Sequence, residues 1–225
     1  MDTLTSIIPN VIEYADQFPK AIVDTMVMLT VTGVVSFLIA MPIAVIVVIT
    51  KPQGICQNHA VFWILDKIIN LFRAIPFVIL LPLLMGVTRF FFHTTIGTKS
   101  AFIPLIVGTV PFMARQLESA MEEIPDGIIE ASISMGMTPW QIIQNVYLKQ
   151  NIPGMVRGMT ITLIAVIGQI AIVGTVAAGG LGDLAIRFGW QRQMQDITYV
   201  VLILLLIIIS LIQFFGDWLV RKTTH

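Results

Sequence analysis

Side chains that could carry out catalysis or bind a metal ion are few and scattered in this sequence. The three histidines, His59, His93 and His225, lie far apart, and Cys56 is the single cysteine. None of them belongs to a set of three or more His or Cys residues at the spacing of a metal site. Residues 97–100 read Gly-Thr-Lys-Ser, but the earlier glycines of a phosphate-binding loop are missing. The sequence therefore predicts no metal site, no cofactor and no ATP site of its own.

The composition indicates an integral membrane protein. The 225 residues are 56% hydrophobic and 12% charged, and the mean hydropathy is +0.91. An average soluble domain has about 25% charged residues. Basic and acidic residues balance at 13 each, so no net field favours nucleic acid or a charged soluble partner.

Five stretches are long and apolar enough to cross a bilayer, which takes about 20 residues of α-helix. We expect an all-α fold with transmembrane helices over residues 25–49, 64–85, 100–118, 155–178 and 197–215. Residues 1–20 lack the features of a signal peptide and are predicted to form a retained interfacial segment. The transmembrane domain then covers residues 21–220, and residues 221–225 form a short tail.

The second predicted span carries three charged residues, Asp66, Lys67 and Arg73, in its first half. A charge at mid-membrane costs about 2.5 to 3.5 kcal/mol. Lys67 and Arg73 are near the end of the span and can reach the interface, and Asp66 lies seven residues before Arg73 on a similar helix face. We favour a structural role for these charges, and a direct role in transport stays open.

The one long polar interval, residues 122–153, is predicted to form two short helices. Gly136 fits the end of the first helix because glycine tolerates a positive φ. Thr138 can cap the second helix, which begins at Pro139, and Gln141 completes a capping-box pattern.

Each of these two helices carries an apolar stripe at helical spacing. The stripes comprise Ile128, Ile129, Ser132 and Met135 on the first helix, and Ile142, Ile143, Val146 and Tyr147 on the second. Such helices lie on a surface or in a groove of a partner. The pattern alone leaves open whether this interval packs only on its own bundle.

Six residues of the interval resemble the Glu-Ala-Ala loop of bacterial ABC-importer permeases. They are Glu130, Ala131, Ser132 and Gly136, followed at the motif's spacing by Val146 and Leu148. Ser132 replaces the third motif residue, and Lys149 stands where the motif has proline. The resemblance implies a coupling helix that docks into a cleft on a cytoplasmic ATPase.

From this resemblance we expect a set of residues to couple the chain to that ATPase. The set comprises Glu130, Ala131, Ser132, Gly136, Ile129, Pro139 and Ile142. Gly136 is expected to supply a hinge, and the apolar faces around Ile129 and Ile142 are expected to fill the groove on the ATPase.

Three further segments are similar to methionine-importer permeases, and the similarity extends over nearly the whole chain. They are residues 73–81, residues 111–115 and the Ala-Gly-Gly-Leu-Gly sequence at residues 178–182. This resemblance implies the five-helix core of a type I ABC importer in the bacterial inner membrane. It also implies a homodimer, two cytoplasmic ATPase subunits and an extracytoplasmic substrate-binding protein that delivers L- or D-methionine. The amino end would be periplasmic and the carboxyl end cytoplasmic.

The fourth predicted span is rich in small residues, which let helix backbones approach closely. Gly168, Gln169 and Gly174 are therefore candidates for lining a substrate pathway. Simple packing between helices explains the glycines equally well, and Gln169 could instead bond to a neighbouring helix.

Other functions are less well supported by the sequence. A gradient-driven transporter normally needs a buried carboxylate, and the predicted spans hold none near mid-membrane apart from Asp66. A membrane scaffold or assembly factor would use residues 122–153 as a general partner site. An intramembrane enzyme lacks a recognisable catalytic set. An importer of this class for another solute, such as glycine betaine, a phosphonate or a polar amino acid, stays open.

Overall fold

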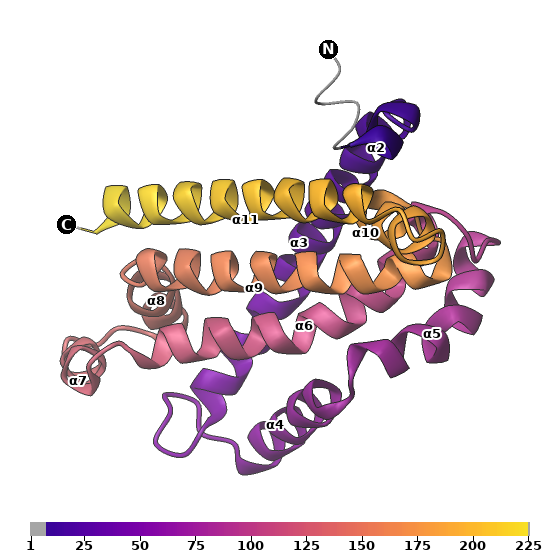
Figure 1. The fold of residues 1–225 in the computed structure, drawn as a ribbon. Coiled ribbons are helices and arrows are strands. Elements are labelled where there is room, and N and C mark those ends of the chain that lie inside the picture. Colours follow the sequence, from indigo (N-terminus) through magenta and orange to yellow (C-terminus); the bar gives the residue numbers. More distant parts are fainter. Residues whose placement is uncertain (1–7, 225) are drawn as a thin grey trace. The chain divides into compact units, whose positions relative to one another are not determined.

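The computed structural model describes residues 8–224, and this part of the chain is helical and turn structure without a β-strand. The helices are α2 (Pro9–Glu13), α3 (Gln17–Thr50), α4 (His59–Ala74), α5 (Phe77–Phe92), α6 (Thr98–Glu122), α7 (Asp126–Ser134), α8 (Pro139–Ile142), η1 (Ile143–Leu148), α9 (Ile152–Val173), η2 (Gly174–Val176), α10 (Gly180–Leu184), η3 (Ala185–Trp190) and α11 (Gln195–Thr223) (Figure 1). The first seven residues of the predicted interfacial segment and the last residue of the predicted tail lie outside the described residues.

Within residues 8–224, four helices are long and apolar enough to cross a membrane, namely α3, α6, α9 with η2, and α11. A fifth span exists only if α4 and α5 are taken together, and these two helices are bent by 105° at their junction. The predicted span over residues 64–85 is thus two helices. The break falls at Ile75, which is extended with ψ 119°, because the following Pro76 disfavours helical geometry in the residue before it.

Most of the observed helices extend beyond the predicted spans, although α9 with η2 ends at Val176, before the predicted end at residue 178. The helix predicted from residue 25 begins at Gln17, and the helix predicted to end at residue 215 continues to Thr223. The extra turns contain charged residues, because a helix can continue into the polar interface after its apolar stretch has ended. Hydropathy therefore locates the apolar part of each helix better than its ends.

The chain forms two compact units. The first comprises residues 8–34, 76–107 and 163–212, and the second comprises residues 35–75, 108–162 and 213–224. Each unit has its own apolar core.

In the first unit, α10 is fixed to the first turns of α3. The backbone N–H of Leu181 donates to Oγ1 of Thr25 at 2.9 Å, and both residues are buried. Gly180 makes this approach possible, because a Cβ atom there would lie 2.9 Å from the same hydroxyl oxygen. Its φ of +81° also favours glycine.

In the second unit, the core joins α3, α4 and α6 to α8 and η1. Its buried side chains include Ala44, Val47, Ile69, Met113, Leu117, Met121, Ile142, Val146 and Tyr147. A buried hydrogen bond from Nδ2 of Asn151 to the Ala120 carbonyl also ties the start of α9 to α6. The polar interval 122–153 is thus built onto the core of its own unit.

An ionic cluster joins α4 to α6 within the second unit. Arg115 lies 2.7 Å from Oδ1 of Asp66 and 2.8 Å from Oε2 of Glu118, and it also donates to Oδ1 of Asn70 at 3.1 Å. The partner of Asp66 is therefore on another helix, and not Arg73 on its own helix as the spacing suggested. Bridging two carboxylates in this way suits the forked guanidinium group. The structural role favoured for Asp66 agrees with these contacts.

We predict that Arg115→Met lowers the stability of the protein by roughly 3 to 5 kcal/mol, because it leaves the buried Glu118 carboxylate without a compensating charge. The expected result is a lower apparent Tm in detergent. The matched control is Arg157→Met, since Arg157 faces Glu123 at 3.8 Å with both side chains more than half exposed. Equal Tm values for the two variants would contradict a stabilising role for the cluster.

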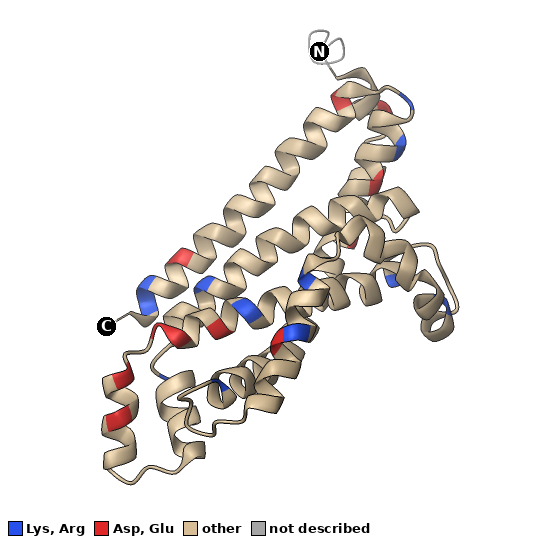
Figure 2. Ribbon diagram, turned by 90° about the horizontal axis from the view of Figure 1, so that it is seen from below, with Lys and Arg blue, Asp and Glu red and all other residues tan. Residues whose placement is uncertain are grey.

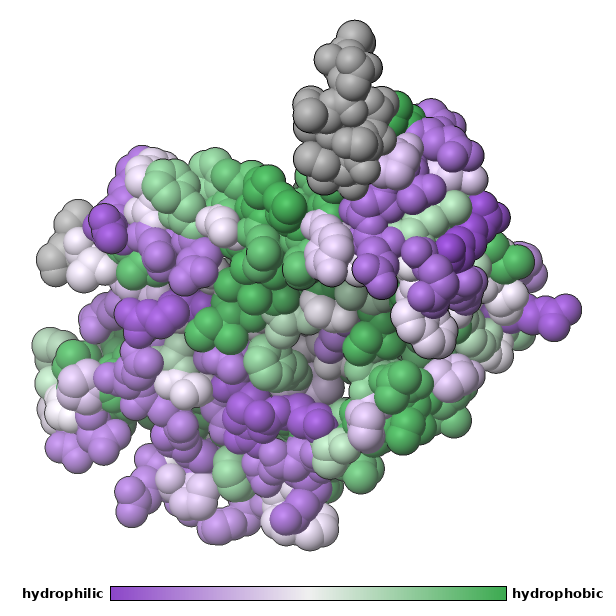
Figure 3. Space-filling view, in the orientation of Figure 1, coloured by the Kyte–Doolittle hydropathy of each residue, from purple (hydrophilic) through white to green (hydrophobic). Residues whose placement is uncertain are grey.

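The surface of α11 in the first unit is strongly apolar. Four of its large apolar residues are each at least half exposed, namely Leu202, Ile203, Leu206 and Ile207. Figure 3 shows apolar surface in green over part of this helix. A soluble monomer rarely exposes a patch of this kind, so the helix requires lipid or another protein around it.

Candidate coupling site

The coupling segment, residues 122–153, has the local structure that its sequence predicts. Gly136 ends the turn after α7 with a φ of +79°. Thr138 and Gln141 form a reciprocal capping box: the Gln141 N–H donates to Thr138 Oγ1 at 3.4 Å, and the Thr138 N–H donates to Gln141 Oε1 at 2.8 Å. Pro139 takes the first position of α8, where its missing N–H is not needed. These local predictions are confirmed.

The inner face of the coupling segment is part of the core of the second unit. Ile142, Val146 and Tyr147 are each at most 2% exposed. Burial raises the pKa of the Tyr147 phenol, and the negative charges of Asp126 and Glu122 raise it further. This face holds the segment on its own chain.

The prediction that Ile129 and Ile142 fill a groove on the ATPase therefore needs correction. Ile142 is 1% exposed, and Ile129 is half-buried against the same core. Ser132 is also buried, and its hydroxyl donates to the Ile128 carbonyl at 2.8 Å. Ile142 is thus part of the chain's own core and cannot touch a partner without leaving it, whereas Ile129 is only partly covered.

The outer face of the segment carries a different set of large apolar side chains. Met135 is 72% exposed, Trp140 is 64% exposed and Ile133 is 52% exposed. The sequence analysis assigns Met135 to the apolar stripe of the first helix, without deciding what covers that stripe, and it does not single out Trp140 or Ile133. Trp140 could have been found, because a large aromatic residue directly after the helix start lies off the stripe that the neighbouring residues form.

The remaining predicted coupling residues, Glu130, Ala131, Gly136 and Pro139, are all exposed on the segment. The exposed surface is also acidic, since no Lys or Arg occurs between Arg115 and Lys149. Figure 2 marks the acidic positions in red.

Four carboxylates lie in this part of the segment, and two of them have basic partners within the second unit. Glu122 contacts Lys51 at 2.9 Å, and Glu123 lies 3.8 Å from Arg157. Within residues 8–224, Asp126 and Glu130 form no ion pair. These two acids on α7 are therefore available to a basic partner surface.

The candidate pathway residues differ from one another in their surroundings within the first unit. Gly168 is exposed, and a Cβ atom there would meet nothing within 4 Å. Gln169 is half-buried. Gly174 is buried against α10, and a Cβ atom there would lie 2.3 Å from the Gly182 carbonyl carbon. The contacts of Gly174 are those of close backbone packing.

The left-handed conformation of Gly136 can be tested by a substitution that adds only a methyl group. The resemblance to ABC-importer permeases implies coupling to a cytoplasmic ATPase, and on that basis we predict that Gly136→Ala lowers ATP hydrolysis by such a complex severalfold. The reason is that the strained turn costs about 1 kcal/mol and shifts α7 against α8. Within residues 8–224, no atom beyond the adjacent residues lies within 4 Å of the added Cβ, so a clash does not contribute. Gly127→Ala is the control, since that position is equally open and helical. Unchanged ATP hydrolysis in Gly136→Ala would argue against a hinge at this residue.

The helical spans, the strongly apolar surface of α11 and a polar two-helix segment anchored to one unit are the features of a multi-pass membrane protein. The model of the family described as binding-protein-dependent transport system inner membrane component matches residues 53–225. The chain belongs to this family. It is thus an inner membrane component of a transport system, and the predictions of a transport subunit and of a type I importer fold are confirmed.

Individual relatives agree with this assignment. The chain is 40% identical over 202 residues to a probable D-methionine transport system permease protein of Vibrio cholerae, covering 90% of each chain. It is 41% identical over 169 residues to the methionine import system permease protein of Bacillus subtilis, covering 75% of this chain and 76% of the relative. Among solved structures, an inward-facing form of the MetNI methionine ABC transporter matches with a TM-score of 0.90 and 42% identity, covering 92% of this chain and 95% of that one.

Proposed function

We propose that this chain is the membrane-spanning subunit of an ATP-driven importer that carries methionine, as the L or D form, from the periplasm to the cytoplasm. The names of the relatives support this substrate. Two proteins that align with most of the chain are named as methionine permeases. The same architecture for another small solute is the alternative. A gradient-driven transporter is less well supported, because the Asp66 carboxylate is already neutralised by Arg115.

The observation that carries the proposal is the two-sided coupling segment. Its inner face is locked into the core of the second unit, and its outer face exposes Met135 and Trp140 beside the acidic α7. An apolar centre with a charged rim is the usual composition of a protein interface. We infer that a groove on a cytoplasmic ATPase, lined by apolar and basic groups, receives this face.

The assembly that follows has two copies of this chain, two ATPase subunits and a substrate-binding protein outside the membrane. If the coupling segment is cytoplasmic, the alternation of five spans places the amino end in the periplasm and the carboxyl end in the cytoplasm. ATPase closure would change the contacts of the segment, and such a difference between states is what can shift the transport equilibrium.

Uptake into proteoliposomes tests the proposal. The permease is reconstituted with its ATPase and binding protein, and the uptake of labelled L-methionine, D-methionine and glycine betaine is measured with internal ATP. ATP-dependent uptake of a methionine enantiomer is expected. Uptake of glycine betaine alone would favour the alternative importer, and uptake driven by an ion gradient without the ATPase would overturn the mechanism.

A further inference from the structure

The first unit contains a polar pocket that the coupling site does not use. Its volume is about 290 Å³, near the lower end of the range for small-molecule sites, which leaves room for one small ligand. The charged and amide side chains that line it are Asp16, Gln17, Lys20, Asp24, Asp183 and Arg187. The pocket therefore has a lining of both charge signs.

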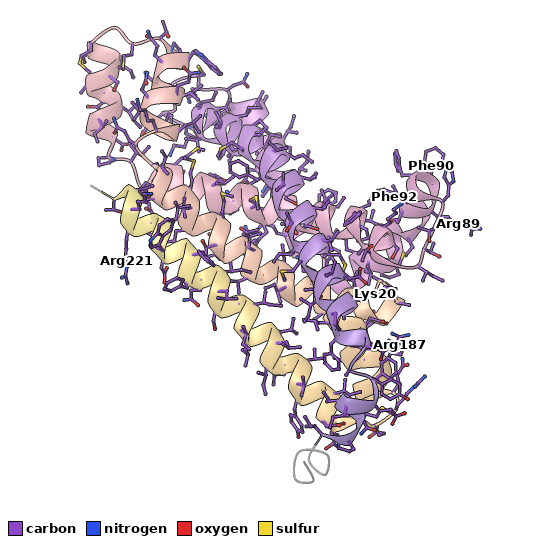
Figure 4. The ribbon with its side chains drawn as sticks, turned by 90° about the horizontal axis from the view of Figure 1, so that it is seen from above. Lys20, Arg89, Phe90, Phe92, Arg187 and Arg221 are labelled. Carbon is purple, nitrogen blue, oxygen red and sulfur yellow. The ribbon has the colours of Figure 1, made fainter. Side chains whose placement is uncertain are left out.

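Two helical faces supply these side chains. Lys20 and Asp24 are four residues apart in the first turns of α3 and so lie on one side of that helix, and Asp16 lies in the turn directly before it. Asp183 and Arg187 have the same interval across α10 and η3. Negative and positive groups thus alternate along each wall. Figure 4 labels the two basic side chains, Lys20 and Arg187, on these separate elements.

Only two of the charged side chains that line the described pocket, Asp183 and Arg187, form an ion pair with each other. Arg187 contacts Asp183 at 3.1 Å and approaches Gln17 at 3.5 Å. In the part of the chain that the structure describes, Lys20 and Asp24 form no ion pair within 4.0 Å. Their charges are available to a ligand that carries the complementary groups.

Two carboxylates, those of Asp24 and Asp183, line the same pocket. Burial raises the pKa of the Asp183 carboxyl, the Arg187 guanidinium opposes this shift, and the negative charge of Asp24 adds to it. A positively charged group placed between the carboxylates would relieve their repulsion.

The backbone on one side of the pocket is bare. Gly179 has a φ of +81°, and a Cβ atom there would lie 3.1 Å from Oδ2 of Asp24. Any other residue would place its side chain against this carboxylate. The absence of a side chain leaves the space beside Asp24 open.

We propose that this pocket binds a free amino acid in its zwitterionic form. Asp24, with Asp16 at the rim, receives the ammonium group, and Lys20 and Arg187 receive the carboxylate. The assignment rests on the proposed function for the choice of amino acid and for the side of the membrane. With the coupling segment in the cytoplasm, the start of α3 and the loop after α9 lie on the outer side, where a ligand arrives.

Saturation-transfer NMR on the permease–ATPase complex in nanodiscs, without the binding protein, tests the site. The probes are L-methionine, its methyl ester, which lacks the carboxylate, and N-acetyl-L-methionine, which lacks the ammonium group. We expect L-methionine to bind and each derivative to bind about tenfold more weakly, as the loss of one charge-assisted contact predicts.

Variants of the pocket should have the same effect. Lys20→Gln and Asp24→Asn are each expected to weaken L-methionine binding about tenfold. The control is Arg221→Gln, which removes an exposed charge from the end of α11 and should leave binding unchanged. Lys20 is exposed, so its replacement does not disturb the core, and a monodisperse elution profile checks the fold of each variant.

Several results would overturn the site. These are no signal from L-methionine, equal binding of the methyl ester, or unchanged binding in Lys20→Gln. Weaker docking of the binding protein without any methionine binding would identify a protein contact and would also overturn it. The outcome is separable from that of the proposed function: a complex that imports methionine without binding it here refutes only the pocket, and a complex that binds it without ATP-driven import refutes only the function.

Discussion

Replacing Met135 and Trp140 together by alanine is expected to reduce the amount of ATPase that copurifies with the permease by about a hundredfold. Both side chains are mostly exposed, and they belong to the residue types that dominate protein interfaces. Truncation of a central tryptophan commonly costs about 2 kcal/mol or more, and methionine adds to this loss. The measurement is the ratio of ATPase to permease after affinity purification through a tag on the permease, followed by titration of the separate subunits.

Trp190→Ala is the matched control for this experiment. Trp190 is 73% exposed and lies in η3, outside the coupling segment, so it reports the cost of removing an exposed tryptophan in general. Copurification is expected to be unchanged in this control. If Met135→Ala with Trp140→Ala also retained its ATPase, the outer face of the segment would not be the docking surface.

The same comparison separates the outer from the inner face. Ile142→Ala removes a side chain that is 1% exposed, so its main effect should be on folding of the second unit. A defect from the outer pair in a permease with normal stability would instead come from the contact itself. The two faces of one short segment thus have separable roles, one in anchoring and one in docking.

The parts of this site that the sequence predicted are those with local causes. The capping box of Thr138 and Gln141 and the turn at Gly136 depend on residues within three positions of each other. Such features form from neighbouring side chains and backbone groups, whatever the rest of the chain does. The apolar spans were predictable for a similar reason, because the membrane imposes the same requirement on every crossing helix.

The parts that the sequence did not predict depend on long-range contacts. The sequence predicts that the stripe containing Ile142 is apolar. The pattern of an apolar stripe does not, however, indicate whether the same chain or a partner protein covers it. Arg115 and Asp66 are 49 positions apart, so their ion pair follows from the packing of α6 on α4. The sequence analysis did not predict the 105° bend after α4. A hydropathy average over the residues on both sides of a proline gives no information on the direction of the two helix axes.

Gly174→Ala is expected to destabilise the permease by about 3 kcal/mol, even though glycine to alanine is normally favourable in a helix. The added Cβ would lie 2.3 Å from the carbonyl carbon of Gly182 and 2.4 Å from the backbone nitrogen of Asp183. Both atoms belong to the backbone, so the clash cannot be relieved by rotating a side chain. Either η2 or α10 must move, and the hydrogen bond that fixes Leu181 to Thr25 would then weaken.

Gly168→Ala is the matched control, because Gly168 lies in α9, the helix that directly precedes η2. In the described part of the chain, no atom outside the local backbone of α9 and the adjacent residues lies within 4 Å of a Cβ at this position. The substitution should therefore raise stability by about 0.5 to 1 kcal/mol through the better helix propensity of alanine. Opposite shifts of the apparent Tm are therefore expected for the same chemical change. If Gly174→Ala kept the wild-type Tm but reduced substrate uptake, Gly174 would line the pathway. The close approach to Gly182 would then not explain why this position requires glycine.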